Sequence, residues 1–400
     1  ECMKAVIFAA GKSTRTYPMT LTRPKPLLPI ANKPILAHQL EALSGLVDGV
    51  FVVVGYMGDM IRERFGSSYA GMPLDYIEQE EQRGTGHALL QCAEKLREPF
   101  IALNGDDLYD PADLAALSKV DQGGLAKTVE DPSQYAIYEV DDKGRALRIV
   151  EKPAEIFSKL ANTGAYAFTP EVFEILKGVA PSERGEIEIT CAIQALADAG
   201  VFRVIEAKGY WQPIAYAWNM LDANTFLLET SLKEDLQGEV SAAAHLNGTV
   251  AIGKGTVIRP GVVIDGPVII GEDCTIGPNA WIRSYTAIGN GCRAGQGTEI
   301  KASILMDGAR VPHLSYVGDS VLGEDVNFGC GTITANFRHD EGNHSSMVKG
   351  ELVDTGRRKL GAIVGDGVHT GINTSIYPGR KLWPGTSTLP GEVVIRDIES

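Results

Sequence analysis

A short run of small and basic residues near the start of the chain has the composition of a phosphate-binding turn. Residues 9–15 read Ala-Ala-Gly-Lys-Ser-Thr-Arg and directly follow an apolar run that predicts a strand. Small residues such as Ala10 and Gly11 let backbone N–H groups approach a phosphate closely. A turn that contains glycine is often only a turn, so this motif is weak by itself.

The charge around the turn strengthens this interpretation. Between residues 1 and 33 the acid is Glu1, and the cations are Lys4, Lys12, Arg15, Arg23, Lys25 and Lys33. The whole chain has a formal net charge of −14, which argues against nucleic acid or an anionic membrane as a partner. A locally positive segment in such a chain predicts a site for a polyanion, and the alternative is a solvated basic edge.

A second chemical pattern follows from a repeat in the later part of the chain. Isoleucine recurs at every sixth position, with Ala294 in the one gap, at Ile252, Ile258, Ile264, Ile270, Ile276, Ile282, Ile288 and Ile300. This period fits neither an α-helix nor a flat strand. It is typical of a left-handed parallel β-helix, in which three hexapeptides form one coil and each isoleucine points inward.

Residues 18 positions apart then lie at the same angle on neighbouring coils. Arg283 and Lys301 have this spacing, so their cationic groups would stack about 4.8 Å apart and repel unless an anion lies between them. Cys274 and Cys292 share the spacing, and we expect stacked, inward-facing thiols in preference to a disulfide. The chain has 6 cysteines without metal-ligand spacing, which indicates a reducing cytoplasm.

The first half has the pattern of a Rossmann-like α/β domain with a mainly parallel sheet. Near-continuous apolar runs at residues 4–9, 50–54 and 100–103 predict strands that are buried on both faces. Helical stretches such as residues 87–96 lie between them. Residues 217–236 predict one amphipathic helix with a leucine stripe, ended by Gly238.

These patterns predict three parts of the chain. They are an N-terminal domain over residues 3–224, a linking helix over 217–238 and a β-helix over 247–395. Residues 338–360 interrupt the repeat with a polar, basic insertion, and long insertions in solenoids tend to lie over binding faces. We expect no membrane span and no signal peptide, with Glu1 and Cys2 as additions ahead of a native Met3.

An ordered series of motifs in the first half resembles the signature of sugar-1-phosphate nucleotidylyltransferases. The series consists of residues 9–15, Arg23-Pro24-Lys25-Pro26-Leu27, Gly84-Thr85-Gly86-His87-Ala88, Asn104-Gly105-Asp106, Glu151-Lys152-Pro153 and Asn162-Thr163-Gly164. The resemblance covers residues 3 to about 224. It implies attack by a sugar-phosphate oxygen on the α-phosphorus of a nucleoside triphosphate, with pyrophosphate as the leaving group.

The resemblance also implies roles for individual residues. Arg15 and Lys25 would neutralise the phosphates, with Lys25 next to the reacting phosphorus, and Asp106 at a strand end would hold Mg²⁺. Ala10 and Gly11 would approach the nucleotide through their backbone. The residues expected to read the base are Gln79, Gly84 and Thr85, and those expected to hold the sugar are Glu151 and Asn162.

Four positions depart from the family pattern. They are Ala136 and Ala215, where glycine is usual, Cys191, where aspartate is usual, and Pro213, where many members place a second metal-binding aspartate. Proline cannot coordinate a metal through its side chain, and Asn219 is the nearest substitute oxygen donor. We therefore expect the nucleotidylyl half to be altered in specificity, slow or inactive.

The second half closely resembles the acetyltransferase part of the bifunctional glucosamine-1-phosphate acetyltransferase/N-acetylglucosamine-1-phosphate uridylyltransferases. Its motifs are residues 312–319, Pro-His-Leu-Ser-Tyr-Val-Gly-Asp, and residues 327–336, Asn-Phe-Gly-Cys-Gly-Thr-Ile-Thr-Ala-Asn. The match covers roughly residues 247–395, and the insertion and Val311-Pro312-His313 look like the archaeal branch.

This second resemblance implies acetyl transfer from acetyl-CoA to the amine of an amino-sugar 1-phosphate. The amine must lose a proton before it attacks, and His313 is the expected base. His313 lies two β-helix faces beyond Lys301, as expected for a site in the cleft between two chains of an obligate homotrimer. By resemblance the sugar phosphate contacts Arg283, Lys301, Tyr316, Asn327 and Asn336, and the acetyl group lies along the backbone at Cys330. Phe337 replaces the tyrosine usual in bacterial members.

Three functions fit these patterns. The first is a bifunctional enzyme that makes a nucleotide-activated acetamido sugar from acetyl-CoA and UTP or dTTP with Mg²⁺. The second is an acetyltransferase whose nucleotidylyl domain has become a nucleotide-sugar-binding regulatory module, which the four departures favour and the intact Arg15, Lys25 and Asp106 oppose. The third is a non-catalytic subunit like the translation-factor exchange proteins, which His313 and its motif oppose. The preferred base, and the choice among glucosamine, galactosamine and glucose, stay open.

Overall fold

A computed structural model describes residues 3–400, so the expectation about Glu1, Cys2 and the native start lies outside the described residues. The chain divides into two compact units. The first contains the chain up to Lys12, Pro24–Leu27 and Ile35–Pro213. The second contains Ser13–Arg23, Leu28–Pro34 and Ile214–Ser400. Two short N-terminal segments therefore group with the C-terminal half of the sequence.

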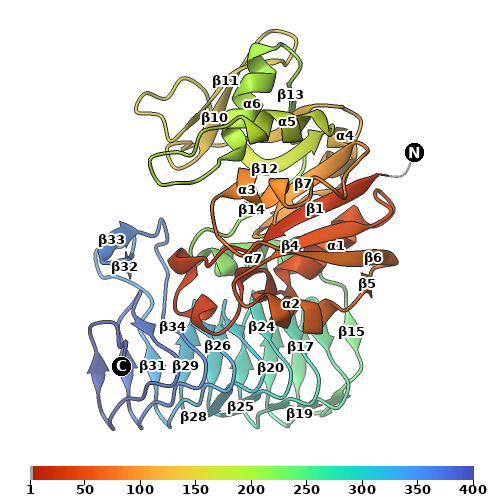
Figure 1. The fold of residues 1–400 in the computed structure, drawn as a ribbon. Helices are drawn as coiled ribbons and strands as arrows, with labels where there is room; N and C mark the ends of the chain where they lie inside the picture. The colour runs from red at the N-terminus through yellow and green to blue at the C-terminus, as the bar shows by residue number, and fades with distance from the viewer. Residues whose placement is uncertain (1–2) are drawn as a thin grey trace. The chain divides into compact units, whose positions relative to one another are not determined.

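The first unit is built on a sheet whose centre is parallel (Figure 1). In spatial order its main path is β11 (Ala146–Glu151), β10 (Ala136–Val140), β12 (Leu160–Phe168), β7 (Phe100–Asn104), β1 (Lys4–Ala9), β4 (Val50–Val54), β6 (Met72–Glu78) and β5 (Ser68–Tyr69). β9 (Gly123–Thr128) pairs with β12 and with β13 (Arg203–Glu206). β1 pairs in parallel with β4 and β7, whereas β12 is antiparallel to β7.

Helices cover both faces of this sheet. Ile7 and Val52 share one apolar cluster with α1 (Ile35–Leu43), α2 (Gly58–Phe65) and α4 (Pro111–Leu117). Val6 and Val53 share another with α3 (Thr85–Leu90), α5 (Glu171–Lys177) and α6 (Ile189–Asp198). Successive side chains of a strand point to opposite faces, so burial on both faces explains the unbroken apolar runs and confirms the predicted α/β fold. The helix predicted over residues 87–96 ends earlier, at Leu90.

The carboxyl ends of the parallel strands gather the polar motifs. β1 leads into the predicted phosphate turn, β6 into Gln79 and β7 into Gly105 and Asp106. The Gly105 N–H donates to the Phe8 carbonyl at 2.9 Å, and a Cβ at position 105 would overlap that carbonyl. Glycine is therefore required where the ends of β1 and β7 meet.

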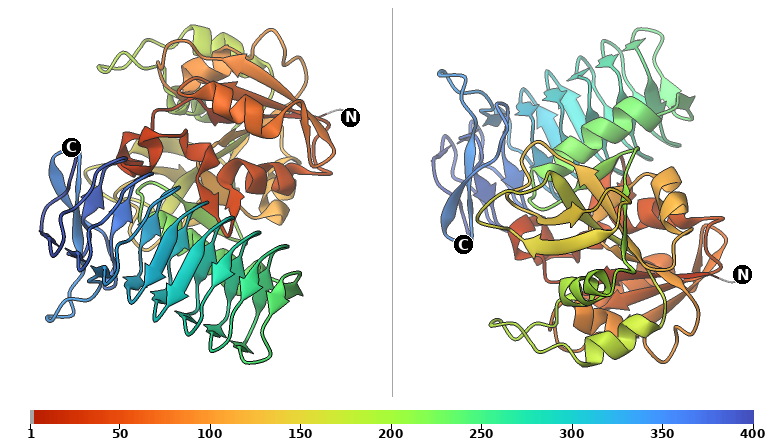
Figure 2. Two further views of the ribbon diagram at one scale, coloured as in Figure 1. Left: turned by 90° about the horizontal axis from the view of Figure 1, so that it is seen from below. Right: turned by 90° about the horizontal axis from the view of Figure 1, so that it is seen from above.

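The second unit is a β-helix of three parallel sheets, whose coils follow one another in chain order (Figure 2). The first face contains β15 (Asp235–Leu236), β18 (Val250–Ile252), β21 (Val268–Ile270), β24 (Thr286–Ile288), β27 (Ile304–Leu305), β30 (Val321–Leu322), β34 (Ile363–Val364) and β36 (Lys381–Leu382). The second face contains β16 (Glu239–Val240), β19 (Val257–Ile258), β22 (Thr275–Ile276), β25 (Arg293–Gln296) and β28 (Arg310–His313). The third face contains β17 (His245–Asn247), β20 (Val263–Asp265), β23 (Trp281–Ile282), β26 (Glu299–Lys301), β29 (Tyr316–Gly318), β31 (Ile333–Thr334), β35 (Ser375–Ile376) and β37 (Val393–Val394).

The repeat of six is confirmed in this architecture. The repeated isoleucines and Ala294 are all buried, and partners such as Ile264, Ile282 and Ile300 stack on successive coils. Cys274 and Cys292 are buried free thiols, and the Cys292 N–H donates to Cys274 Sγ at 3.4 Å. The predicted β-helix and the predicted stacking of these thiols are therefore correct.

The predicted linking helix is shorter than expected. α7 covers Asn219–Ser231, and β15 at Asp235–Leu236 already pairs with β18. Gly238 does not end the helix, because it lies on the first coil, where a Cβ would come within 2.6 Å of the Thr256 carbonyl. Pairing with the next coil thus overrides the helical pattern of residues 232–236.

Short elements complete the two units. The predicted insertion contains an antiparallel hairpin of β32 (Ser345–Val348) and β33 (Glu351–Asp354). A second hairpin is formed by β2 (Pro29–Ile30) and β3 (Lys33–Pro34). Within the second unit, Asn32 Nδ2 at its turn donates to the carbonyl of Ile288 in β24 at 2.7 Å. The remaining pair is β8 (Asp107–Tyr109) with β14 (Trp211–Pro213), and the 3₁₀ helices are η1 (Thr14–Thr16), η2 (Met19–Leu21) and η3 (Lys25–Leu27). Within residues 3–400 no helix has the length and apolarity to cross a membrane.

Candidate active sites

The first unit brings together two residues predicted to handle phosphate and metal. Lys25, in η3, is only 4% exposed, and its Nζ lies 2.9 Å from Asp106 Oδ2. Asp106 follows β7 and its side chain is 39% exposed. The ion pair holds the buried ammonium beside an accessible carboxylate, and ammonium and carboxylate groups are the types that bind phosphate and Mg²⁺.

The residues predicted to read the base lie around the start of α3. Gln79 is buried, and its Nε2 lies 3.0 Å from His87 Nδ1 and 3.3 Å from the Gly84 carbonyl. Gly84 has φ 94°, and a Cβ there would come within 2.6 Å of the Ile187 carbonyl. Thr85 is the first residue of α3. Burial lowers the pKa of His87, which favours a neutral ring beside the Gln79 amide.

Gln82 is a further residue at this edge that the sequence motifs did not reveal. Its Nε2 donates to the Ala10 carbonyl at 2.6 Å, and the Tyr56 N–H donates to the same oxygen at 3.1 Å. Ala10 is buried and Gly11 is exposed. The carbonyl of the turn is thus fixed from two sides. No sequence signal marks Gln82, because it acts through a hydrogen bond to backbone.

Part of the positive charge of residues 1–33 is neutralised in the structure by carboxylates that lie elsewhere in the sequence. Arg23 is 4% exposed and is paired with Asp366 and Glu324 in the second unit. Lys25 is paired with Asp106. Arg15 belongs to the second unit too, with its guanidinium 5.7 Å from the centroid of the Tyr216 ring. The sequence argument therefore overestimated the unneutralised charge, since it could not see these distant carboxylates.

The residues predicted to hold the sugar lie on the antiparallel part of the sheet. Glu151 ends β11 opposite Ala136 in β10, so the departure at 136 adjoins a predicted sugar ligand. Asn162 is already well bonded: its Oδ1 accepts from the Gly164 N–H at 3.1 Å, and its Nδ2 donates to Tyr166 Oη at 2.7 Å. The structure thus fixes the Asn162 amide in one orientation.

The geometry around Asp106 clarifies the metal question. In the β8–β14 pair Pro213 lies opposite Asp107, so position 213 belongs beside the loop that carries Asp106. The proposed substitute, Asn219, is engaged, because its Oδ1 accepts from the N–H groups of Ala215 and Tyr216 at 3.1 and 2.8 Å. Both lone pairs of that oxygen are used, which argues against Asn219 as a metal ligand.

In the part of the chain that the structure describes, no cluster of three or more His, Cys, Asp or Glu side chains could hold a metal. Asp106 with phosphate oxygens and water still suits Mg²⁺.

The β-helix gathers four predicted sugar-phosphate residues around one cavity of about 230 Å³. The lining residues are Arg283, Lys301, Tyr316, Asn336, Phe337 and Lys359. Arg283 and Lys301 occupy equivalent positions on neighbouring coils, as the spacing predicted. Burial raises the pKa of Tyr316, so its hydroxyl stays neutral and can donate to an anion.

The anions beside Arg283 and Lys301 are carboxylates of the protein, so the expectation that a bound anion must separate the two cations is wrong. Arg283 Nη1 lies 2.9 Å from Glu299 Oε1, and Lys301 Nζ lies 2.9 Å from Asp319 Oδ2. Each cation therefore has its own carboxylate. Lys359, which the sequence analysis missed, has no carboxylate partner among the described residues, and its Nζ lies 6.0 Å from the Phe337 ring centroid. The cavity keeps an excess of positive charge.

Asp319 is a third residue that the sequence analysis did not single out. Its side chain is 4% exposed, and its Oδ2 accepts from Lys301 Nζ and from Asn336 Nδ2 at 2.9 and 2.7 Å. Asn336 Nδ2 also lies 3.0 Å from Tyr316 Oη. One buried carboxylate thus orients two of the predicted ligands directly and Tyr316 through Asn336. Its position in the 312–319 motif was the available signal.

His313, Asn327 and Cys330 are not part of this cavity. His313 ends β28 on the second face. Asn327 forms an isolated parallel β-bridge with Arg310 of β28, so it lies on the same face. Lys301 and Tyr316 are on the third face, so the predicted spacing of two faces is confirmed. His313 is exposed, and Cys330 lies near the following corner, where its carbonyl accepts from the Asn373 N–H at 2.8 Å.

Comparison with known proteins identifies the type of both halves. Residues 4–230 match the nucleotidyl transferase domain family, and residues 264–378 match the GMPPB C-terminal domain family. A crystal structure of UDP-glucose pyrophosphorylase complexed with UDP-glucose is 27% identical, with a TM-score of 0.53 over 57% of this chain and 99% of that chain. The likeness to this enzyme covers the nucleotidylyl half.

Curated relatives extend over the whole chain. The bifunctional protein GlmU of Methanococcus maripaludis strain C7 is 44% identical over 99% of this chain and 96% of its own length. The same-named protein of Methanocaldococcus jannaschii is 38% identical over 100% and 96% of the two chains. The bifunctional sugar-1-phosphate nucleotidylyltransferase/acetyltransferase of Sulfurisphaera tokodaii is 36% identical over 99% and 98%. The chain therefore belongs to the family of bifunctional sugar-1-phosphate nucleotidylyltransferase/acetyltransferases.

Proposed function

We propose that this enzyme makes UDP-N-acetylglucosamine or a closely related nucleotide sugar from small-molecule substrates. Residues 247–395 would acetylate glucosamine 1-phosphate, and residues 3–224 would then transfer a nucleotidyl group from UTP or dTTP. The observation that carries the proposal is the cavity on the third face, which joins Arg283, Lys301, Tyr316 and Asn336.

The acetyl-transfer site would bind the sugar phosphate through its excess of cations. Arg283, Lys301 and Lys359 supply the charge, and Asp319 keeps Lys301 and Asn336 oriented. The amine nitrogen attacks the acetyl carbonyl of acetyl-CoA, the C–S bond breaks, and the CoA thiolate leaves. A base must take the amine proton. The backbone near Cys330 would lie along the acetyl group.

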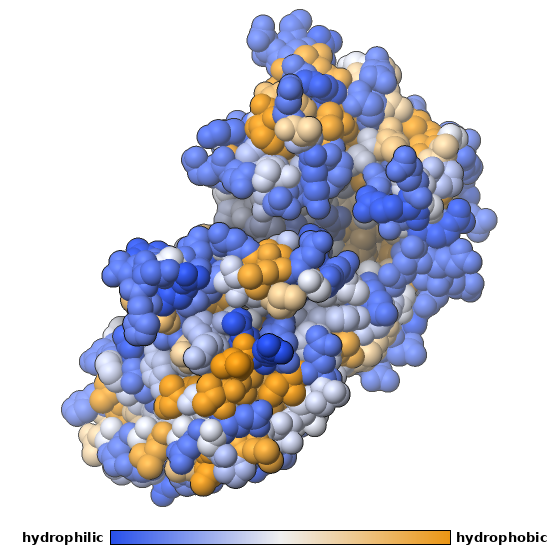
Figure 3. Space-filling view, turned by 90° about the vertical axis from the view of Figure 1, so that its left-hand side faces the viewer, coloured by the Kyte–Doolittle hydropathy of each residue, from blue (hydrophilic) through white to orange (hydrophobic). Residues whose placement is uncertain are grey.

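His313 is proposed as that base, supplied by a neighbouring copy of the chain. It is exposed and lies on a different face from the cavity, so a second β-helix has to bring the two faces together. Figure 3 shows orange patches on one face of the molecule, and exposed apolar patches are usual sites of contact between copies. Ile333, Ile372, Leu389 and Val393, in the C-terminal coils, are exposed apolar residues. We propose a homotrimer that works in the cytoplasm. An active, stable monomer in light scattering would contradict the shared site.

The nucleotidylyl site would use charge neutralisation in place of covalent chemistry. Lys25 and Arg15 would bind phosphate oxygens of the nucleoside triphosphate, and Gln79 would contact the base. Asp106, which is 39% exposed and follows β7, would hold Mg²⁺. The metal would supply further neutralisation of the phosphates. Glu151 and Asn162 would position the acetylated sugar phosphate, whose oxygen attacks the α-phosphorus as pyrophosphate leaves.

The deciding experiment follows the two products separately. The protein is incubated with glucosamine 1-phosphate, acetyl-CoA, UTP and Mg²⁺, while thiol release and pyrophosphate release are recorded. We expect thiol release first and pyrophosphate release dependent on it. Parallel incubations in which galactosamine 1-phosphate replaces glucosamine 1-phosphate, or dTTP replaces UTP, measure the preference for the sugar and for the base. Thiol release without pyrophosphate release under all arms would favour the regulatory-module alternative.

A further inference from the structure

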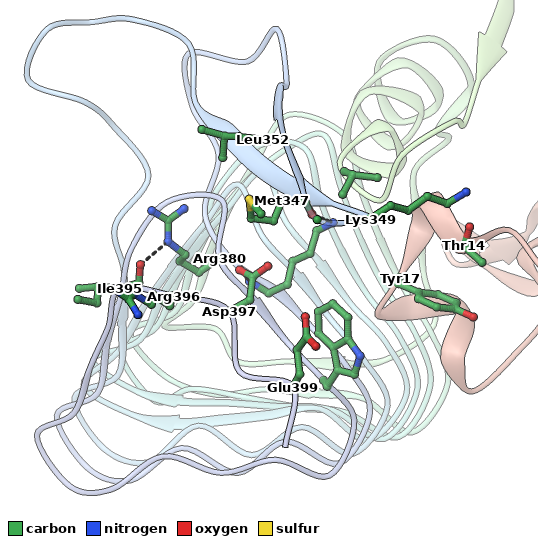
Figure 4. Close-up of a pocket in the computed structure, with 14 residues that line it drawn as sticks. Thr14, Tyr17, Met347, Lys349, Leu352, Arg380, Ile395, Arg396, Asp397 and Glu399 are labelled. Carbon is green, nitrogen blue, oxygen red and sulfur yellow. Dashed lines mark hydrogen bonds between the residues drawn. The ribbon is translucent and has the colours of Figure 1, made fainter.

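The second unit contains another cavity, of about 760 Å³, that neither transfer reaction uses. Its walls come from three segments that are distant in sequence (Figure 4). Thr14 and Tyr17 come from the segment at η1, Lys349 from the β32–β33 hairpin, and Lys381 and Asp397 from the last coils. All of them belong to the same compact unit. A cavity of this size suits a small molecule of nucleotide dimensions.

Lys381 places a buried cation in the wall of this cavity. It is 2% exposed, and its Nζ donates to the Met347 carbonyl at 2.7 Å and lies 5.6 Å from the centroid of the Trp218 ring. The charged group of the protein that stabilises this ammonium is the Asp397 carboxylate, which acts on it electrostatically. An ammonium has three N–H donors, and a buried cation is unfavourable unless it is paired. Burial lowers the pKa of Lys381 to about 8.

The rim of the cavity adds a second ammonium. Lys349 and Gly350 join β32 to β33 and have φ 50° and 80°, as in a type I′ hairpin turn. The turn holds an exposed lysine, without a partner among the described residues, at the cavity. The hydroxyl groups of Thr14 and Tyr17 line the same cavity. Ammonium and hydroxyl groups are the donors that a phosphate group accepts from.

Carboxylates line the cavity as well, and they refine the expected ligand. In the view of Figure 4, Thr14, Tyr17 and Lys349 lie toward one side, and Asp397 lies toward the other. Asp397 Oδ1 accepts from the backbone N–H of Lys381 at 2.9 Å, which leaves its second oxygen for another donor. A carboxylate would repel a phosphate but accepts hydrogen bonds from hydroxyl groups.

We propose that this cavity binds a phosphate ester of a sugar or nucleoside, with the phosphate near Lys349 and Lys381 and the hydroxyl groups near Asp397. The ester would add a second negative charge beside Lys381, whose ammonium has Asp397 as its counter-charge within the protein. The proposal goes beyond the two transfer reactions, because Thr14, from the 9–15 motif, is the one lining residue that belongs to a motif of either reaction.

Isothermal titration of the full chain with ribose 5-phosphate at pH 8 tests the proposal. Parallel titrations with inorganic phosphate and with ribose distinguish the ester from its two parts. We expect the ester to bind more tightly than inorganic phosphate, and ribose not to bind. Equal binding of phosphate and ester, or binding of ribose alone, would overturn the proposed ligand class.

Proton uptake gives a second readout. A bound anion raises the pKa of Lys381 from about 8, so at pH 8 binding should draw roughly half a proton from the buffer. The ester is already a dianion at this pH, because its second pKa is about 6. The other charged groups that face the cavity are Lys349, Arg380, Arg396, Asp397 and Glu399. Titration in two buffers of different ionisation enthalpy measures the uptake, and Lys381→Met should abolish it.

A surface variant keeps the test valid if Lys381→Met does not fold. Lys349→Asn removes the rim charge and retains a residue that tolerates positive φ, and it should weaken ester binding about tenfold. The matched control is Lys254→Asn, since Lys254 is an exposed lysine that is also followed by a glycine with positive φ. Unchanged affinity in Lys349→Asn, or an equal loss in Lys254→Asn, would refute the site. Binding at either transfer site would not respond to Lys349.

Discussion

The two proposed sites use a lysine–carboxylate pair in opposite senses. In the nucleotidylyl half the lysine is buried and the carboxylate exposed: Lys25 is 4% and Asp106 39% exposed, at 2.9 Å. In the acetyl half the carboxylate is buried, since Asp319 is 4% and Lys301 16% exposed, again at 2.9 Å. In the proposed roles the buried Asp319 orients Lys301 toward a phosphate. In the first pair both partners would meet the ligand, Lys25 a phosphate and the more exposed Asp106 a metal.

The two halves also differ in how well they keep the family pattern. The departures Ala136, Cys191, Pro213 and Ala215 all lie in the nucleotidylyl half. Ala136 adjoins Glu151, and Pro213 lies opposite Asp107. The acetyl cavity gathers four of the five predicted sugar-phosphate ligands, and Phe337 is the notable substitution there. The comparison predicts that the nucleotidylyl half limits the overall reaction.

The largest effect is expected for the first pair. Lys25→Ala or Asp106→Ala should lower nucleotidylyl transfer about 10³-fold, because each removes charge that stabilises the transition state. Pyrophosphate release measures the loss, and thiol release from acetyl-CoA should be unchanged. If Asp106→Ala runs at full rate and still requires Mg²⁺, Asp106 is not the metal ligand.

The next effect concerns the base of the acetyl half. His313→Ala should lower acetyl transfer about 10²-fold or more, because the amine loses its proton acceptor. Pyrophosphate release from pre-acetylated sugar phosphate is the control and should persist. Equal loss of the two activities would contradict two separate sites.

A smaller effect should follow from the buried partner of the second pair. Asp319→Asn should raise the KM for glucosamine 1-phosphate about tenfold with little change in kcat, because it frees Lys301 and weakens the hold on Asn336. Glu299→Gln, which removes the more exposed carboxylate beside Arg283, is the matched comparison and should have less effect. A larger effect in Glu299→Gln would reverse the role assigned to burial.

The smallest effect is expected from restoring family residues to the weaker half. Ala136→Gly, Cys191→Asp, Pro213→Asp and Ala215→Gly should each raise pyrophosphate release or broaden sugar use. A repaired contact worth about 1 kcal/mol corresponds to roughly fivefold in rate. Acetylation is the internal control. If the native rates of the two reactions are already equal and repair changes nothing, the departures are neutral.

Much of the architecture could be predicted from local pattern. A repeat of six residues determines a β-helix, because each isoleucine must reach the core once per face. Apolar runs such as Val50–Val54 determine buried parallel strands, because both faces of the sheet are covered. The order of short motifs indicated the family, and the spacing of Arg283 and Lys301 gave their stacking.

Only the tertiary structure decided which groups neutralise or orient one another. The sequence does not show that Asp366 pairs with Arg23, that Asp319 joins Lys301 to Asn336, or that Asn219 is used by backbone N–H groups. The sequence pattern also predicted a helix that continues beyond the end of α7, whereas Asp235 and Leu236 form a strand that pairs with the next coil. Periodicity is a local property that the order of residues specifies directly. Charge pairing and hydrogen bonding depend on which distant side chains the fold brings within about 3 Å, and that distance is set by the packing of whole coils and strands.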